Sequence, residues 1–190
     1  MTDAVSTHLE LGPLFRLCHV IRWLLLAFLL VQIVFFILSW VIPMPLSLGP
    51  IHIQLDPDGM GVGLVRELSS LQKTAGILIG LPGLAALSYG IVRLGQALAG
   101  FQQGRIFAID TIARLRSSAG ATCLAIVLFM LEKPLRLMAF NAFGSGKGYP
   151  ISIDVTSNEL LLLLMCSLFY LIAGVMQEGR RLSEENEGFI

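Results

Sequence analysis

Long uncharged apolar segments alternate with short charged segments along this chain. The apolar segments are residues 23–42, 74–92, 117–131 and 160–177. A transmembrane helix needs about 20 consecutive apolar residues, and three of the four segments come close to that length. We therefore expect an all-α integral membrane protein with four transmembrane helices. With their flanking turns, these spans cover about residues 17–42, 74–100, 111–139 and 157–182.

The third apolar segment, residues 117–131, is the shortest because charged residues stand close to both of its ends. Arg116 precedes it, and an amphipathic stretch, residues 132–140, follows it. A long arginine side chain can carry its charge from a helix end to water, and an amphipathic stretch can lie along a membrane interface. The sequence thus predicts a short span, a kink at Pro134, and residues 132–140 lying along the interface.

Two helix starts carry capping signals. Asp110 precedes the third span as a candidate N-cap residue. Thr156 and Glu159 have the spacing of a capping box and precede the fourth span. Trp23 and Trp40 stand near the two ends of the first span, where aromatic residues often mark the two membrane interfaces.

A face of small residues runs along the second span, and one polar residue lies within the first. Gly76, Gly80 and Gly83 recur at near-helical spacing, and Gln32 lies near the centre of the first apolar segment. Small residues let helices approach closely, and amides form hydrogen bonds between helices. We expect these four residues to mediate helix packing. No charged residue or histidine lies in the middle of an apolar segment, which argues against an ion-coupled pump.

Two short segments outside the spans have the period of a strand. Residues 51–55 and 151–155 each follow a proline, and apolar side chains alternate in both. With four spans, both segments fall on the outer side of the membrane. We expect them to pair there as a small extracytoplasmic β-ribbon.

The order of segments also repeats. Residues 14–17, LFRL, resemble residues 112–115, IARL, and residues 102–105, QQGR, resemble residues 177–180, QEGR. The chain therefore has the pattern of two tandem hairpins, each with an arginine-flanked start and a Gly-Arg exit. Such a repeat has parallel sense and differs from the inverted repeats of many transporters.

The composition supports a membrane location. Hydrophobic residues make up 55% of the chain and charged residues 14%, and the mean hydropathy is +0.79. Basic and acidic residues are equal at 13 each, so no global charge indicates direct binding of nucleic acid. The three cysteines lie in or beside apolar segments without motif spacing, which is typical of small apolar side chains.

Positive charge is distributed unevenly between the two sides of the membrane. With a cytoplasmic N-terminus, eight arginines fall inside: Arg16, Arg22, Arg93, Arg105, Arg114, Arg116, Arg180 and Arg181. Five basic residues fall outside: Arg66, Lys73, Lys133, Arg136 and Lys147. Cytoplasmic loops carry the excess of Lys and Arg, so we expect both termini in the cytoplasm.

No group of residues has a pattern typical of catalysis. The glycine-rich residues 144–148 lack the spacing of a phosphate loop, and no serine or cysteine has a nucleophile's setting. His52 near Asp56 and Asp58 would need further ligands to hold a cation. We expect a non-enzymatic protein without cofactor or metal.

Charged residues gather at the inner ends of the spans. Arg180 and Glu184, and likewise Arg181 and Glu185, have i,i+4 spacing, so the fourth helix should continue into the cytoplasm. Taken by themselves, the arginines can be explained as positive charges that anchor the spans on the cytoplasmic side. That explanation does not account for the Gly-Arg pair that recurs at residues 104–105 and 179–180, which favours a surface for a partner. The candidate interaction residues are Gly104, Arg105, Phe107, Arg114, Arg116, Gly179, Arg180, Arg181, Glu184, Glu185 and Asn186.

Most of the chain resembles a known bacterial family at these same positions. Residues 104–107 with 112–116, and residues 178–182 with 184–186 and the apolar end 189–190, are similar to the pattern of domain-of-unknown-function family 2975. Gly120 matches a family glycine, but the asparagine usual near position 110 is absent. The resemblance implies a small four-helix inner-membrane protein, often encoded beside a small helix-turn-helix regulator, and a signalling role.

Two functions remain open. The leading interpretation is an interaction protein of the bacterial inner membrane that controls a small cytoplasmic regulator through its inner face. The alternative is a transport-accessory or immunity protein that binds a hydrophobic compound or peptide within the helix bundle. In that case Gln32, the three glycines of the second span and Tyr89 would matter more than the C-terminal end.

Overall fold

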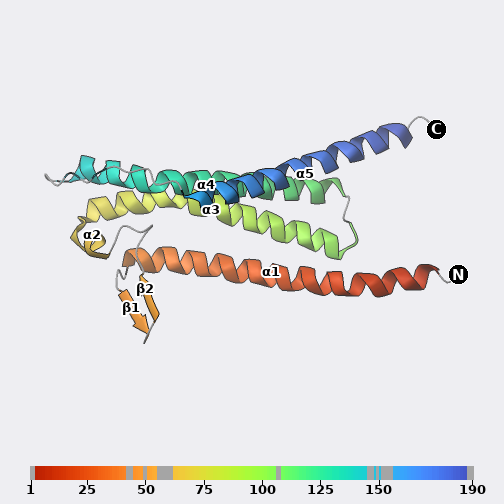
Figure 1. The fold of residues 1–190 in the computed structure, drawn as a ribbon, viewed down its shortest axis with the longest axis horizontal. Coiled ribbons are helices and arrows are strands. Elements are labelled where there is room, and N and C mark those ends of the chain that lie inside the picture. Colours follow the sequence, from red (N-terminus) through yellow and green to blue (C-terminus); the bar gives the residue numbers. More distant parts are fainter. Residues whose placement is uncertain are drawn as a thin grey trace. The chain divides into compact units, whose positions relative to one another are not determined.

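The structure, a computed structural model, describes residues 3–41, 45–48, 51–54, 62–105, 108–144, 148, 150 and 156–187. It is built mainly of helices (Figure 1). The helices are α1 (Asp3–Val41), α2 (Val62–Glu67), α3 (Ser70–Gln102), α4 (Ile109–Phe143) and α5 (Ser157–Glu187), and the strands are β1 (Pro45–Leu48) and β2 (Ile51–Gln54).

Within the described residues, three helices are long and apolar enough to cross a membrane. They are Arg16–Val41 in α1, the whole of α3, and Ser157–Leu182 in α5. The chain therefore has the helices of a multi-pass membrane protein. Helix α4 is 35 residues long but is not among the three. Charged residues stand close to both ends of its apolar centre, residues 117–131.

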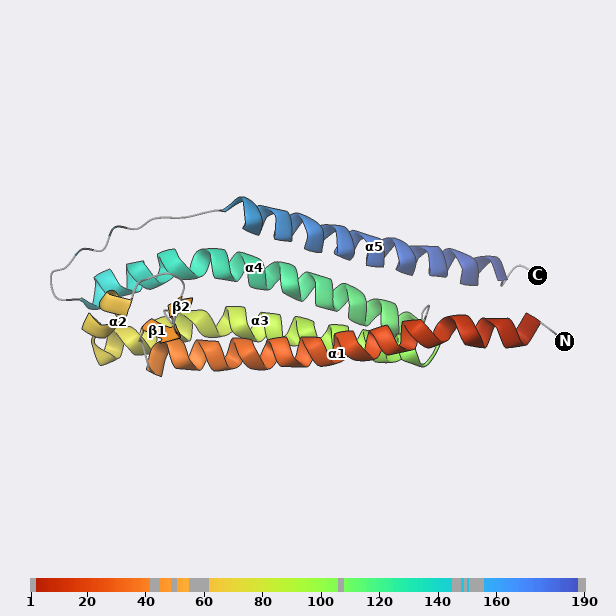
Figure 2. The ribbon, with the colours of Figure 1, turned by 60° about the horizontal axis from the view of Figure 1, so that its bottom comes forward.

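The helices pack as two compact units, and each long helix contributes residues to both. Unit 1 comprises Met1–Leu29, Leu87–Cys123 and Leu163–Ile190. Unit 2 comprises Leu30–Ala86 and Leu124–Leu162. In both units α3 and α4 lie side by side (Figure 2). Two glycine contacts mark this packing. A Cβ added at Gly90 would lie 2.9 Å from Thr122 Oγ1 in unit 1, and one added at Gly83 would lie 2.8 Å from Phe129 Cε1 in unit 2.

Helix α3 ends in a turn that requires glycine. Gly104 has a φ of 71°, its N–H donates to the Phe101 carbonyl, and the Arg105 N–H donates to the Gly100 carbonyl. This is the hydrogen-bond pattern of a Schellman motif. Gly179, the matching glycine of the QEGR segment, lies within the continuous helix α5. The two Gly-Arg segments therefore have different structures, and the prediction of two matched exits was wrong.

Helix α4 begins slightly earlier than the sequence indicated. The Ala108 carbonyl accepts hydrogen bonds from the N–H groups of Thr111 and Ile112. Asp110 thus lies inside the first turn and is not the N-cap residue. A carboxylate in the first turn still interacts favourably with the helix dipole.

Helices α3 and α5 each begin with a reciprocal pair of hydrogen bonds between side chains and backbone N–H groups. At α5, the Thr156 N–H donates to Glu159 Oε2 at 2.8 Å, and the Glu159 N–H donates to Thr156 Oγ1 at 3.3 Å. The predicted capping box is therefore confirmed. Ser69 and Gln72 form the same pair of bonds at the start of α3, at 2.9 Å and 3.3 Å.

Residues 132–140 remain part of α4, which continues through Pro134. Glu132, Arg136, Leu137 and Phe140 are all buried. The prediction of a separate segment along an interface was therefore wrong, because the stretch continues α4 and its Arg136 and Phe140 side chains pack against α3 and α1 in unit 2.

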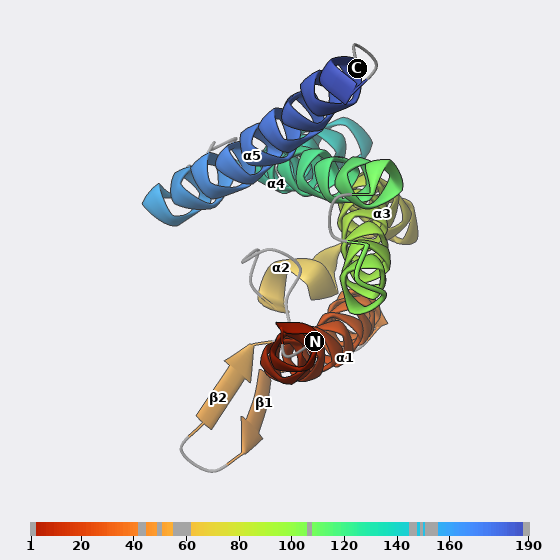
Figure 3. The same ribbon diagram turned by 90° about the vertical axis from the view of Figure 1, so that its right-hand side faces the viewer.

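Strand β2 forms at Ile51–Gln54, within the segment where the sequence predicted a strand. It pairs antiparallel with β1, in a register that joins Pro45 to Gln54 and Leu48 to Ile51 (Figure 3). Segments that are close in sequence pair most readily, which favours this local hairpin. The other strand of the predicted ribbon, residues 151–155, lies outside the described residues.

Candidate functional site

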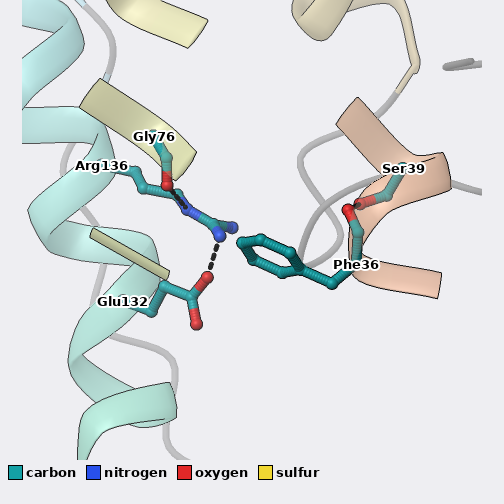
Figure 4. Close-up of polar contacts among 5 residues, drawn as sticks. All are labelled: Phe36, Ser39, Gly76, Glu132 and Arg136. Carbon is teal, nitrogen blue, oxygen red and sulfur yellow. Dashed lines mark hydrogen bonds and ion pairs between the residues drawn. The ribbon is translucent and has the colours of Figure 1, made fainter. Parts of the chain in front are cut away.

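A buried ion pair lies in α4, one turn of helix apart. Arg136 and Glu132 are joined through Nη2 and Oε1, and their side chains are only 1% and 8% exposed. Arg136 Nε also donates a hydrogen bond to the Gly76 carbonyl of α3 at 3.2 Å (Figure 4). Burying two charges costs several kcal/mol per ion, so such a pair is tolerated only with good geometry and additional hydrogen bonds.

Two glycines of α3 make room for this pair. A Cβ added at Gly80 would lie 2.6 Å from both Arg136 Nη2 and Glu132 Oε1. A Cβ added at Gly76 would overlap the ring of Trp40. The small-residue face of α3 is thus filled by a charged pair and an indole ring. Gly83, one turn further along, packs against the ring of Phe129.

Trp40 of α1 closes the site from a third helix. Its ring centroid lies 5.1 Å from the Arg136 guanidinium carbon, a cation–π arrangement. Trp40 is only 6% exposed and forms a core cluster with Leu68 and Phe140. Trp40 therefore packs inside unit 2, but these contacts do not test the predicted position of Trp40 at a membrane interface. Trp23, in contrast, is 63% exposed and donates to His19 Nε2 at 3.0 Å.

A second polar contact ties the start of α3 to the end of α4. Gln72 Nε2 donates to the Phe140 carbonyl at 3.0 Å in a buried position. Together with the Arg136 bond to Gly76, it connects the two helices at Arg136 and one turn of α4 beyond it. Trp40 Nε1, by contrast, is buried without a hydrogen-bond partner among the described residues.

The sequence interpretation missed this site because it treated each apolar segment alone. Glu132 and Arg136 lie beyond the third apolar segment, but they contact Gly76 and Gly80 inside the second, residues 74–92. The sequence did contain one usable signal. Glu132 and Arg136 on one helix are four residues apart, and so are Gly76 and Gly80 on the other. Charged residues buried in a membrane bundle are costly and often functional.

Gln32 does not make the predicted hydrogen bond between helices. It is half-buried, and its side chain forms no hydrogen bond with another described residue. The predicted packing role of Gly76, Gly80 and Gly83, in contrast, agrees with their close contacts.

Arg116 joins α4 to α5 in unit 1. Its guanidinium carbon lies 4.9 Å from the centroid of the Tyr170 ring, and Nη1 donates to Gln177 Oε1 at 3.1 Å. A Cβ added at Gly120 would lie 3.3 Å from the same Tyr170 ring. The charge of Arg116 is therefore directed to α5.

The C-terminal end of α5 is helical as far as Glu187, as the sequence predicted. Arg181 pairs with Glu178 at 2.8 Å, and both side chains are more than half exposed. Residues 184–186 belong to the same helix, but their side chains lie outside the described part of the chain. The predicted pairs of Arg180 and Arg181 with Glu184 and Glu185 are thus not tested.

The other candidate residues lie around the α3–α4 connection. Gly104 and Arg105 are exposed, and Arg114 is half-buried. Phe107 lies outside the described residues.

A polar pocket opens between α3 and α4 in unit 1. Its volume is about 430 Å³, and its lining residues are Arg93, Asp110, Ala113, Arg114 and Ser117. Tyr89 borders it, with its hydroxyl 3.2 Å from the Ser117 hydroxyl and its ring centroid 5.0 Å from the Arg93 guanidinium carbon. The sequence interpretation named Arg114 but had no signal for the pocket.

An apolar pocket lies in unit 2, between the first turns of α3 and the end of α4. Its volume is about 530 Å³, and it is lined by Ser70, Leu71, Thr74, Ala75, Leu78 and Phe143. No group of three or more potential metal ligands occurs within the described residues.

Comparisons with known proteins found no matching family model, no matching curated protein and no matching solved structure. The resemblance to family 2975 therefore stays a hypothesis.

Proposed function

We propose that this chain is a non-enzymatic protein of the bacterial inner membrane that binds and controls a small cytoplasmic regulator. In this proposal the chain crosses the membrane four times, as two hairpins with both termini in the cytoplasm. The partner is a small helix-turn-helix regulator, and the resemblance to family 2975 supplies that expectation.

The contacts of α4 support a fourth span. At 1.5 Å per residue, its 35 residues extend over about 52 Å, more than the roughly 30 Å of the hydrocarbon layer. Its buried charges, Glu132 and Arg136, neutralise each other, which lowers the cost of placing them in the bilayer. In this proposal α3 of unit 2 shields the pair from lipid.

The ion pair also sharpens the charge argument for orientation. Arg136 is paired and buried, so it does not act as a free basic residue of an outer loop. Removing it from the outer side leaves eight basic residues inside against four outside: Arg66, Lys73, Lys133 and Lys147. The difference favours cytoplasmic termini more strongly than the full count does.

The observation that carries the proposed role is the unbroken extension of α5. The helix continues beyond the apolar segment that ends at Gln177 and presents exposed charges of both signs, including the Glu178–Arg181 pair. A rigid charged helix end can select a partner through complementary charge, which contributes more to specificity and association rate than to affinity.

Recruitment of the regulator to membranes tests this proposal. We expect a chain that stops after Gln177 to insert normally but to lose recruitment of a fluorescently tagged regulator encoded beside it. A matched variant, Glu178→Lys with Arg181→Glu, keeps the intrahelical pair but reverses its direction. It should insert and weaken recruitment as well. Unchanged recruitment by the truncated chain would rule the proposal out.

The apolar pocket of unit 2 favours a second candidate, binding of a hydrophobic compound or peptide. The glycine positions themselves are occupied by Trp40, the ion pair and Phe129, so a ligand would lie in the neighbouring pocket beside Ala75 and Leu78. Under this alternative, Ala75→Trp would fill the pocket and abolish protection or transport. Truncation after Gln177 would leave that phenotype intact.

A further inference from the structure

The polar pocket of unit 1 contains charges that are not satisfied within the described part of the chain. Asp110 and Arg114 lie one turn apart on α4 and both line the pocket, yet no ion pair or hydrogen bond joins either side chain to another described residue. Arg93 reaches the pocket from α3, where it interacts with the Tyr89 side chain and, at 3.5 Å, with Gln96 Oε1. Among the described residues, no ion partner neutralises the charges of Asp110 or Arg114 in this pocket.

The pocket also lies at the end of the apolar part of α3. Arg93 directly follows the uncharged segment, residues 74–92, and Ser117 opens the uncharged segment of α4. Exposed apolar side chains flank it: Tyr89 and Val92 on α3 and Ile109 on α4. Lipid headgroups meet a transmembrane helix at this depth, and basic pockets between such helices bind phospholipid headgroups.

We infer that this pocket binds the headgroup of a phospholipid with a primary ammonium, as in phosphatidylethanolamine. Arg93 and Arg114 bind the phosphate from the two helices, and the Ser117 hydroxyl donates to a phosphate oxygen. The Asp110 carboxylate accepts hydrogen bonds from the ammonium. Side chains one turn apart have Cβ atoms about 5–6 Å apart, which suits a phosphate and an ammonium joined by two carbons.

Asp110 is the residue that selects this lipid. The ammonium offers three N–H donors, and hydrogen bonds between ionised groups are roughly twice as strong as neutral ones. A choline headgroup has no N–H to donate. An anionic glycerol headgroup has the same phosphate charge but brings only neutral hydroxyls to Asp110, so it lacks the ionic hydrogen bonds that the ammonium makes. The inference requires that α3 spans the membrane but is independent of the cytoplasmic partner.

Lipid binding to the purified full-length protein tests the inference. Delipidated protein in detergent is titrated separately with phosphatidylethanolamine, phosphatidylglycerol and phosphatidylcholine, and bound lipid is counted by native mass spectrometry. We expect phosphatidylethanolamine to bind roughly tenfold more tightly than the other two. Inorganic phosphate and phosphoethanolamine serve as soluble competitors that separate a lipid site from a general anion site.

Three variants assign the roles. Asp110→Asn should remove the preference for phosphatidylethanolamine, and Arg114→Gln should weaken all three lipids. Arg22→Gln, which changes an exposed arginine of α1 outside the pocket, is the matched control and should leave lipid binding unchanged. Helical circular dichroism and elution volume confirm that each variant is folded.

Equal binding of the three lipids, or a preference that survives Asp110→Asn, would overturn the inference. Tighter binding of phosphatidylglycerol than of phosphatidylethanolamine would also overturn it. So would displacement of bound lipid by inorganic phosphate at a concentration no higher than the lipid concentration needed for binding.

Discussion

Arg136 donates a hydrogen bond to the carbonyl of Gly76, 60 residues earlier in the chain, at a distance of 3.2 Å. The same guanidinium pairs with Glu132 and lies against the ring of Trp40. One arginine of α4 therefore contacts α3 and α1 within unit 2. The ion pair therefore links three helices of unit 2, and changes to it should alter the stability of the protein.

Removing one partner of the buried pair should cost more than removing both. Arg136→Met leaves the Glu132 carboxylate buried without its charge partner, which typically costs 3–5 kcal/mol. The double variant Glu132→Leu with Arg136→Met leaves no buried charge and should recover most of that loss. The free energy of unfolding in mixed micelles, from denaturant titration, provides the measurement. Equal losses in the single and double variants would contradict a buried pair.

Two glycines of α3 should respond in opposite ways to alanine. A Cβ at Gly80 overlaps Arg136 Nη2 and Glu132 Oε1, and overpacking of this kind costs about 1–3 kcal/mol. Gly95 has nothing within 4 Å of its added Cβ, so alanine there should gain about 0.5–1 kcal/mol in helix stability. Thermal unfolding of Gly80→Ala and Gly95→Ala in the same detergent compares the two. A loss at Gly95 as large as that at Gly80 would refute the packing difference.

The two glycines of the repeated Gly-Arg segments form a second matched pair. Gly104 has a φ of 71°, where an alanine costs about 1–2 kcal/mol. Gly179 lies inside α5 with open space around it, so alanine there should stabilise the helix. Midpoints of thermal unfolding for Gly104→Ala and Gly179→Ala should therefore shift in opposite directions. Shifts of the same sign would show that the two segments adopt the same conformation after all.

The number of spans can be measured by labelling single cysteines in spheroplasts. With Cys18, Cys123 and Cys166 replaced by alanine, Gly148→Cys should react with a membrane-impermeant maleimide, and Glu187→Cys should react only after lysis. Three spans would place the two termini on opposite sides. A cysteine near the N-terminus, Ser6→Cys, completes the set and should behave like Glu187→Cys if α4 crosses the membrane.

Local features of the fold could be predicted from the sequence, because their determinants lie within a few residues. The capping box of Thr156 and Glu159 and the helical extension beyond Gln177 are examples. The strand at residues 51–54 was also recognisable from its alternation, but its partner was not, since alternation does not encode pairing.

The candidate site depends on contacts between segments, which the linear pattern does not contain. Glu132 and Arg136 have the pattern of a surface stretch on their own helix. They are buried because Gly76 and Gly80 expose backbone on the neighbouring helix and leave space for both side chains. The contact of Trp40 with Gly76 was missed for the same reason, because it joins two segments that lie far apart in the sequence.

The dependence of the ion pair on Gly76 and Trp40 has a consequence for biogenesis. A helix that carries Glu132 and Arg136 enters the lipid at a high cost while it is alone, because only its neighbours supply the carbonyl and the aromatic face for the guanidinium. Helices α1 and α3 precede α4 in the chain and are therefore synthesised first. If α4 crosses the membrane, as we propose, it can leave the insertion machinery directly onto a surface that already accommodates its charges, so that the order of synthesis and the order of stable insertion coincide.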